Sequence, residues 1–487
     1  MKNLYAILGI LLTVSQAFGQ VAVGGFETPL QEKAQAYVVS DHEQAVNYLL
    51  LHKKEQSRIY KLNAQMQVED SISPIALDSK YTQNAGSLIE DGQPVLFWST
   101  KNKNSYASQK YDFKTQQYST KEFELNLKKE KILCQFTWGN QLHILTVLEN
   151  SSVVKMYKFT NSTTLKSQLI DLSTYIFFDK DYKKENFDKI LKYSFILYGL
   201  TYEPYELEQM DHRTVTPLPM ASNKKKFYVE NNNLYITLDH HVDYTEVIRI
   251  DLVNSTSTQI YVKKPAIEAG SRYELNSNSF LYHDQLFQIK TSNKKMFLTV
   301  KDLEGKLLSE FTADSKSTLD YLNQKPVLQN NGKNTSYKDS QMASSLLKQL
   351  KKDRIAVSSF THKQGYSLQF GAVAARELNL DPAAFDSFEL SDGLHIAALS
   401  TSWSANPMLM KFQAFTESPN TFATVLTDRD FQPIPGQVEP TVFQKIHTFI
   451  NNKEFYSTAE TLFQFQEKIY LGYFDRQAGR YRFYAFK

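Results

Sequence analysis

The sequence predicts an all-β protein built from about eight copies of one four-stranded unit. The unit is clearest at 224–262, where four short apolar runs alternate with turns rich in Asn, Asp and Ser. The expected strands are Phe227–Glu230, Leu234–Asp239, Thr245–Asp251 and Gln259–Val262. β-branched and aromatic residues in such runs are typical of half-buried strands. Because an isolated four-stranded meander makes a poor domain, we expect copies of it elsewhere in the chain.

The second and third strands of this unit recur along the chain. The better copies are Gln141–Ile144 with Val153–Phe159, Gln285–Ile289 with Lys295–Val300, Gly393–Ile396 with Met408–Phe415, and Lys468–Leu471 with Arg480–Phe486. Three weaker copies are Asn47–Leu51 with Arg58–Leu62, Pro94–Trp98 with Ser108–Phe113, and Arg354–Phe360 with Tyr366–Phe370. From Tyr48 to Leu96 is 48 residues, and from Leu96 to His143 is 47. Such a period suits one propeller blade, which takes roughly 40–50 residues.

This repetition resembles the β-propeller superfold at the level of architecture. The resemblance implies a ring of about eight four-stranded blades, within a range of seven to nine, with short helical insertions. It points to no particular family, because the repeats carry no WD dipeptide, no kelch double glycine and no Ser-x-Asp-x-Gly box. The first and last blades of such a ring must meet. The last unit ends after its third strand, so we expect residues around Gly24–Val39 to supply the missing outer strand.

Insertions interrupt the repeat near 172–222, 313–352 and 417–456. Apolar residues at helical spacing predict short helices at Asp181–Lys192, Asp339–Lys352 and Glu439–Asn452. Loops and insertions on a rigid scaffold often carry function, although most simply cover the edge of a blade.

The first 19 residues have the pattern of a secretory signal peptide: Lys2, an apolar run, then Ala17-Phe18-Gly19 as the cleavage site. We therefore expect 1–19 to be removed and 20–487 to form a single propeller domain. The pattern favours export in a Gram-negative cell, to the periplasm or the outer membrane, or to the outside. With Cys134 as its one cysteine, the chain forms no internal disulfide.

The charge balance excludes some classes of partner. A formal net charge of +3 gives no strong attraction to nucleic acid or to anionic lipid. The apolar run near the N-terminus is shorter than the ~20 residues that span a bilayer, so we expect no integral membrane segment.

Two places in the sequence are candidate binding sites. The segment Asp239-His240-His241-Val242-Asp243 lies between the second and third strands of the clearest unit. Asp239, His240, His241 and Asp243 suit a transition metal, and the two histidines suit another ligand, whereas a solvated loop is the structural alternative. Trp403 occupies the equivalent loop of another unit and suits stacking on a sugar or a peptide, or packing over a blade end.

No catalytic or cofactor motif accompanies these residues. The sequence has no nucleophile elbow, P-loop, dinucleotide fingerprint or His-Glu-x-x-His pair, and we predict no cofactor. The export signal and the degenerate repeats therefore favour a non-catalytic scaffold, or accessory subunit, that binds other envelope proteins. Such a protein would be similar in architecture to the propeller subunits of outer-membrane assembly, Tol-type and secretion machines. The alternative is a carbohydrate-binding or carbohydrate-active propeller, because two converging carboxylates leave no linear trace.

Overall fold

Four antiparallel strands form where the sequence pattern is clearest, at β17 (Lys225–Glu230), β18 (Asn233–Leu238), β19 (Tyr244–Asp251) and β20 (Ser257–Lys263). All four predicted strands are confirmed within a few residues. A short strand, β16 (Glu208–Met210), adds parallel to β17 and makes this a five-stranded sheet. The computed structural model describes residues 20–29, 34–53, 56–74, 77–193, 205–268, 274–336, 343–363, 365–374, 406–452 and 457–487.

Six further sheets of four or five strands surround this one in the described part of the chain. Three precede it: β2 (Gln35–Asp41), β3 (Val46–Lys53), β4 (Gln56–Leu62) and β5 (Val68–Ile72); β6 (Tyr81–Glu90), β7 (Gln93–Thr100), β8 (Ser105–Asp112) and β9 (Gln117–Glu124); β10 (Glu130–Trp138), β11 (Gln141–Leu148), β12 (Val153–Phe159) and β13 (Leu165–Asp171). One follows directly: β21 (Asn276–Tyr282), β22 (Gln285–Thr291), β23 (Lys295–Asp302) and β24 (Leu307–Asp314).

The last two sheets take strands from separate parts of the chain. One has the order β26 (Lys333–Ser336), β25 (Gln324–Asn330), β29 (Asn420–Asp428), β28 (Gly365–Val373) and β27 (Arg354–His362). The other has the order β1 (Gln20–Glu27), β32 (Arg480–Phe486), β31 (Lys468–Asp475) and β30 (Ser457–Phe465). A two-stranded ribbon, β14 (Phe177–Phe178) with β15 (Lys184–Glu185), is the eighth sheet of the described residues.

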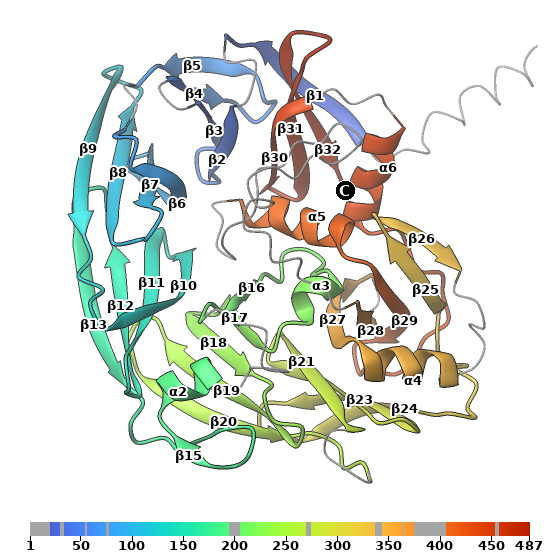
Figure 1. Cartoon of the computed structure of the whole chain (residues 1–487). Helices are drawn as coiled ribbons and strands as arrows, with labels where there is room; N and C mark the ends of the chain where they lie inside the picture. Colours follow the sequence, from blue (N-terminus) through green and yellow to red (C-terminus); the bar gives the residue numbers. More distant parts are fainter. Residues whose placement is uncertain are drawn as a thin grey trace, which may run out of the picture.

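These sheets stand in a ring, and the strands nearest its middle are β2, β6, β10, β16, β21, β27 and β30 (Figure 1). Inner strands of neighbouring sheets contact one another: β30 with β2, β2 with β6, β6 with β10, and β21 with β27. Clusters of buried apolar side chains fill the spaces between neighbouring sheets. The protein is therefore a β-propeller, and the seven large sheets formed by the described residues lie within the predicted range of seven to nine blades.

The N-terminal strand closes the ring. β1 pairs antiparallel with β32, from Gln20 opposite Phe486 to Glu27 opposite Arg480. The predicted outer strand is thus present, but it runs over 20–27 rather than 24–39, because β2 is the inner strand of the first blade. Gly24 and Gly25 permit this pairing: a Cβ on Gly25 would lie 2.5 Å from the backbone oxygen of Tyr481.

Five helices of the described residues lie within or beside the predicted insertions: α2 (Phe187–Tyr193), α3 (Leu218–Ala221), α4 (Ala343–Lys352), α5 (Pro407–Glu417) and α6 (Val442–Asn451). Helices α2, α4 and α6 confirm the three predicted helical segments. No helix in the described ranges is long and apolar enough to cross a membrane.

One predicted strand is wrong. Met408–Phe415 is not a strand but the body of α5, because Asn406 caps the first turn through Leu409 N and Pro407 takes a first-turn position. The buried residues Met408, Phe412 and Phe415 follow helical spacing and pack with α6 against the β30–β32 sheet. Its proposed partner, 393–396, lies outside the described residues.

The closure model predicts a large effect from a small change on β1. We expect Gly25→Val to lower the free energy of unfolding by roughly 1–3 kcal/mol, because the added side chain meets backbone that cannot yield. Val21→Ala, at a position on the same strand that is 65% exposed, should leave stability within about 0.5 kcal/mol of wild type. Urea unfolding of the two variants measures both changes in stability. Equal midpoints for Gly25→Val and Val21→Ala would contradict closure of the ring by β1.

Candidate functional site

The Asp239–Asp243 segment follows β18 at one end of the sheet, and the turn between β17 and β18 lies at the other. We call the end with Asp239–Asp243 the loop face. The opposite end, which carries the turns after β17 and β21, is the turn face. Candidate residues occur on both faces, and the two groups have different chemistry.

Asp239 is fully buried and paired with two buried lysines. Its carboxylate lies 3.2 Å from Lys226 Nζ and 2.9 Å from Lys264 Nζ. It also accepts hydrogen bonds from Thr245 Oγ1 at 2.9 Å and from the backbone N–H and Oγ of Ser279 at 3.1 and 2.7 Å. Burial by itself raises the pKa of the Asp239 carboxyl, but Lys264 and Lys226 outweigh it and hold that pKa well below its usual range. Burial lowers the pKa of Lys264 to about 8.

The next two residues hold the β14–β15 ribbon. The Nε2 atoms of His240 and His241 lie 2.8 and 3.1 Å from the backbone oxygen of Phe178. Both imidazoles therefore turn toward the same carbonyl of β14 in the described structure. Asp243 is half exposed, lies 3.4 Å from Lys290 Nζ, and accepts a hydrogen bond from the hydroxyl of Tyr182 on the ribbon.

The four predicted metal ligands therefore occupy different environments: a buried ion pair, two contacts with a carbonyl, and a surface carboxylate. Metal or ligand binding by this loop stays a prediction. Trp403, the other predicted site residue, lies outside the described residues, so stacking on Trp403 also stays a prediction.

The loop and the ribbon together assemble an aromatic surface, which we call the tyrosine patch: Ile176, Tyr182, Tyr244 and Tyr261. Tyr182 and Tyr261 are each 40% exposed, and Ile176 is 46% exposed. Tyr244 lies between the two exposed rings, with ring centroids 6.4 Å from Tyr182 and 5.0 Å from Tyr261. His241 supports the patch from below, because its ring stacks on Tyr244 at 4.2 Å.

A buried carboxyl lies beside the tyrosine patch. Glu246 on β19 is fully buried, and Gln259 Nε2 donates to it at 2.6 Å. Gln259 Nε2 and the Tyr261 hydroxyl also donate to the backbone oxygen of Ile176, which fixes the start of the ribbon. Burial raises the pKa of Glu246 to about 8, against a smaller lowering by Gln259. At neutral pH the carboxyl is therefore protonated.

The buried ion pair predicts that Asp239 and Asp243 differ strongly in their contribution to the stability of the fold. We expect Asp239→Asn to destabilise the fold by about 3–5 kcal/mol, because it leaves two buried ammonium groups without their shared counter-charge. Asp243→Asn, four residues away on the same loop, should cost about 1 kcal/mol or less, because its carboxylate is 50% exposed. Chemical unfolding at neutral pH compares the two, and similar losses would contradict this account.

Glu246 predicts a pH dependence of stability. Below pH 4.5, its ordinary pKa, the carboxyl is protonated in both the folded and the unfolded chain. Between pH 4.5 and about pH 8, only the folded chain keeps this proton. The contribution of Glu246 to the free energy of unfolding is therefore lost as the pH rises through this range. In wild type this group should lower the free energy of unfolding by roughly 1.4 kcal/mol per pH unit across that range, and Glu246→Gln should remove this decline.

The measurement is the free energy of unfolding of wild type and Glu246→Gln at several pH values. Glu124→Gln, on the exposed side of β9, is the matched control and should follow wild type. A Glu246→Gln variant whose stability runs parallel to wild type across this range would show that Glu246 does not retain its proton.

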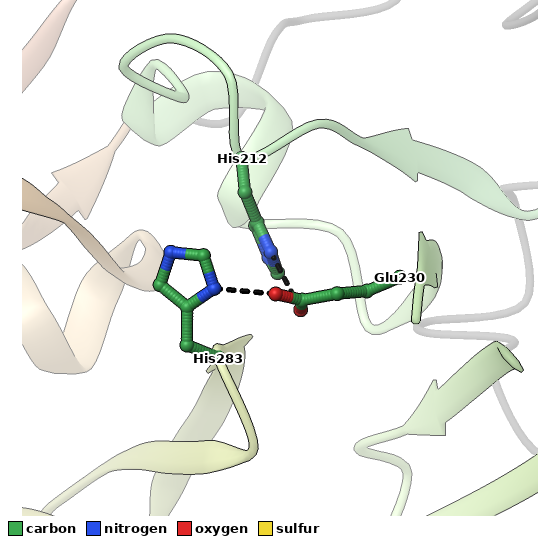
Figure 2. Close-up of side chains that lie close together, drawn as sticks. All are labelled: His212, Glu230 and His283. Carbon is green, nitrogen blue, oxygen red and sulfur yellow. Dashed lines mark hydrogen bonds and ion pairs between the residues drawn. The ribbon is translucent and has the colours of Figure 1, made fainter. Parts of the chain in front are cut away.

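The turn face holds a second cluster: His212, Glu230 and His283 (Figure 2). His212 Nδ1 lies 3.0 Å from Glu230 Oε2, and His283 Nδ1 makes a short contact with Glu230 Oε1. His212 Nε2 lies 2.8 Å from the backbone oxygen of Leu281. Burial raises the pKa of the Glu230 carboxyl, but the hydrogen bonds and charge of the two histidines outweigh it, so its pKa lies below its ordinary value.

Three separate elements bring this cluster together. His212 follows the extra strand β16, Glu230 ends β17, and His283 opens the two-residue turn between β21 and β22. His283 and Asp284 have φ of 48° and 62°, the left-handed pair that a tight hairpin requires. None of the three residues was predicted from the sequence, because no local spacing relates them and because strand β16 was not predicted.

Comparisons with known proteins give no family. No family model matches the chain, and no curated protein matches it. Solved structures are similar only remotely. The β-propeller domain of Nup133 from Vanderwaltozyma polyspora covers 96% of this chain and 100% of its own, at 10% identity and a TM-score of 0.32.

Two other structures are similarly distant. A protein from Lactobacillus plantarum covers 74% of this chain and 83% of its own, at 8% identity and a TM-score of 0.28. A luciferin-regenerating enzyme covers 85% of this chain and 100% of its own, at 8% identity and a TM-score of 0.25. At these values the similarity gives no information on function.

Proposed function

We propose that this chain is an exported, non-catalytic β-propeller of the cell envelope that binds another protein, as a scaffold or an accessory subunit of an outer-membrane assembly or secretion machine. The observation that carries the proposal is the tyrosine patch. Tyrosine is enriched at protein interfaces because its ring buries a large apolar area while its hydroxyl keeps a polar contact. Here two half-exposed tyrosines and an isoleucine lie together, with Tyr261 on β20 and with Ile176 and Tyr182 on the ribbon beside it.

The contacts beneath the patch suit a binding surface that is already formed before its partner arrives. The ribbon that carries Ile176 and Tyr182 is fixed to the sheet by His240, His241 and Gln259, all through backbone carbonyls. A ribbon whose backbone is held in this way loses little freedom on binding, which preserves affinity. The role of the two predicted histidines in this proposal is to position the surface and not to contact the ligand.

Export is the second part of the proposal. Strand β1 begins at Gln20, so cleavage after Gly19 would leave the closing strand complete. A mature chain that starts at Gln20 can therefore form the full ring. The partner is then to be sought among envelope proteins.

The experiment is affinity isolation of the tagged chain from envelopes, followed by binding measurements with the purified partner. We expect Tyr182→Ala and Tyr261→Ala to weaken partner binding by about tenfold or more each, as interface anchors do, with nearly unchanged melting. Leu307→Ala is the matched control, because Leu307 is an apolar residue on β24, 51% exposed and on another sheet. It should bind like wild type.

The outcomes separate the proposal from its carbohydrate alternative. Stacked, half-exposed tyrosines also suit a sugar ring, which is the one observation that favours a lectin. If the two tyrosine variants keep the protein partner, the patch is not its docking surface. If they keep that partner and lose binding to envelope glycans on an array, the carbohydrate alternative replaces the scaffold.

A further inference from the structure

We propose that His212, Glu230 and His283 form a binding site for a divalent transition-metal ion of the zinc class. Among the described residues, this is the one group of three or more His, Cys, Asp or Glu side chains whose ligand atoms all lie within 4.8 Å of one another. The site is independent of the tyrosine patch, because it lies on the opposite face of the disc. Two imidazoles and a carboxylate are a donor set that Zn²⁺ takes in proteins.

The two ring nitrogens of His212 have different partners, and this difference makes Nδ1 the atom that can bind an ion. Its Nε2 faces the carbonyl oxygen of Leu281, which only accepts hydrogen bonds, so Nε2 carries a hydrogen. A neutral His212 then has a bare lone pair on Nδ1, and this lone pair points at Glu230 Oε2 from 3.0 Å. A bare imidazole nitrogen that faces a carboxylate oxygen at this distance leaves a place for a positive charge between the two atoms. That charge is either a proton or a metal ion.

His283 repeats the arrangement from the other side of the same carboxylate. Its Nδ1 contacts Glu230 Oε1, so both histidines present Nδ1 to one carboxylate (Figure 2). A single divalent cation satisfies both nitrogens and the carboxylate at once.

The surroundings of His212 match those of a metal ligand. Ligating histidines usually donate their other ring N–H to a carbonyl or carboxylate, which fixes the ring and its tautomer. The contact between Nε2 and the Leu281 oxygen does this. The residue before His212 is also fixed: the Asp211 backbone oxygen accepts from Lys411 Nζ of α5 at 2.6 Å.

The third ligand gives the site access to solvent. The side chains of His212 and Glu230 are 10% and 15% exposed, whereas that of His283 is 47% exposed. Because His283 Nδ1 and Glu230 Oε1 are in short contact, a central ion requires these two atoms to separate, and His283 lies on a surface turn. Three protein ligands leave a fourth position, which water or an external donor can occupy.

The experiment uses the full mature chain, purified with a tag free of histidine and stripped with a chelator. Isothermal titration with ZnCl₂ should give one ion per chain, and the melting temperature should rise with zinc. The visible spectrum of the Co²⁺ form should show a four-coordinate site. Glu230→Gln and His283→Gln should each weaken zinc binding by about tenfold or more and abolish that spectrum.

His447→Ala is the matched control, because it removes an imidazole on α6 that belongs to no such group among the described residues. It should bind zinc like wild type. His283→Gln lies on an exposed turn, so its circular dichroism and melting without zinc should match wild type and show that folding is intact.

Two results would overturn the proposal. One is zinc binding of the same strength in wild type, Glu230→Gln and His283→Gln, which would place the ion elsewhere on the chain. The other is no binding at micromolar zinc together with a pH dependence of melting that Glu230→Gln removes. That second result would make the cluster a proton site, with protons and not a metal between the imidazoles and the carboxylate.

Discussion

The interior of the disc depends on the Asp239 carboxylate and the two lysines that it holds. Lys226 comes from the inner strand β17, and Lys264 follows the outer strand β20 of the same sheet. Lys226 Nζ also donates to Asn278 on the next inner strand, β21, at 2.8 Å. The Asn278 amide in turn donates to Ser222 O at 2.9 Å and to Ile355 O on β27 at 2.8 Å. One buried polar chain therefore connects three consecutive sheets of the ring.

Such a network gives little net stability compared with an apolar core of the same shape, because burying charges is expensive. It does fix how the sheets meet, since each buried donor and acceptor has one geometry in which it is satisfied. Propeller blades pack through similar apolar faces that tolerate small rotations. The hydrogen bonds of Asn278 join β21 to Lys226 on β17 and to the Ile355 carbonyl on β27.

Much of the fold was predictable because strands and turns are local features of sequence. The sequence also contains a signal that we did not use: in six sheets of the described residues an Asp or Asn lies at the end of the third strand or within two residues after it. The side chain of this residue accepts backbone N–H groups of the following turn. These residues are Asn63, Asp112, Asn161, Asp251, Asp302 and Asp428. The first three are spaced by 49 residues. The seventh sheet needs no such turn, because its outer strand comes from the N-terminus.

The sequence was less informative where distant segments meet. Met408–Phe415 fits both a strand and a helix by composition, and only the cap at Asn406 and the packing against α6 decide between them. The candidate sites were difficult to predict for the same reason, because their residues come from distant segments of the chain. Asp239–Asp243 was visible as a dense polar run, but its role depends on Phe178 and Ser279, which no pattern connects to it. His212 and His283 are separated by 71 residues and meet only because their blades are neighbours.

The pairing of β1 with β32 has a consequence for the order of events during synthesis. The strand that completes the ring is made first, and its partner ends at Phe486, 466 residues later. At ribosomal rates of about 5–20 residues per second, β1 must wait roughly 20–90 s for that partner. During this time the inner strands can pair locally, while both ends of the open ring stay unpaired and prone to aggregation. Ring closure is thus a contact of very high sequence separation, and contacts of this kind form slowly because a long loop must close before they are made.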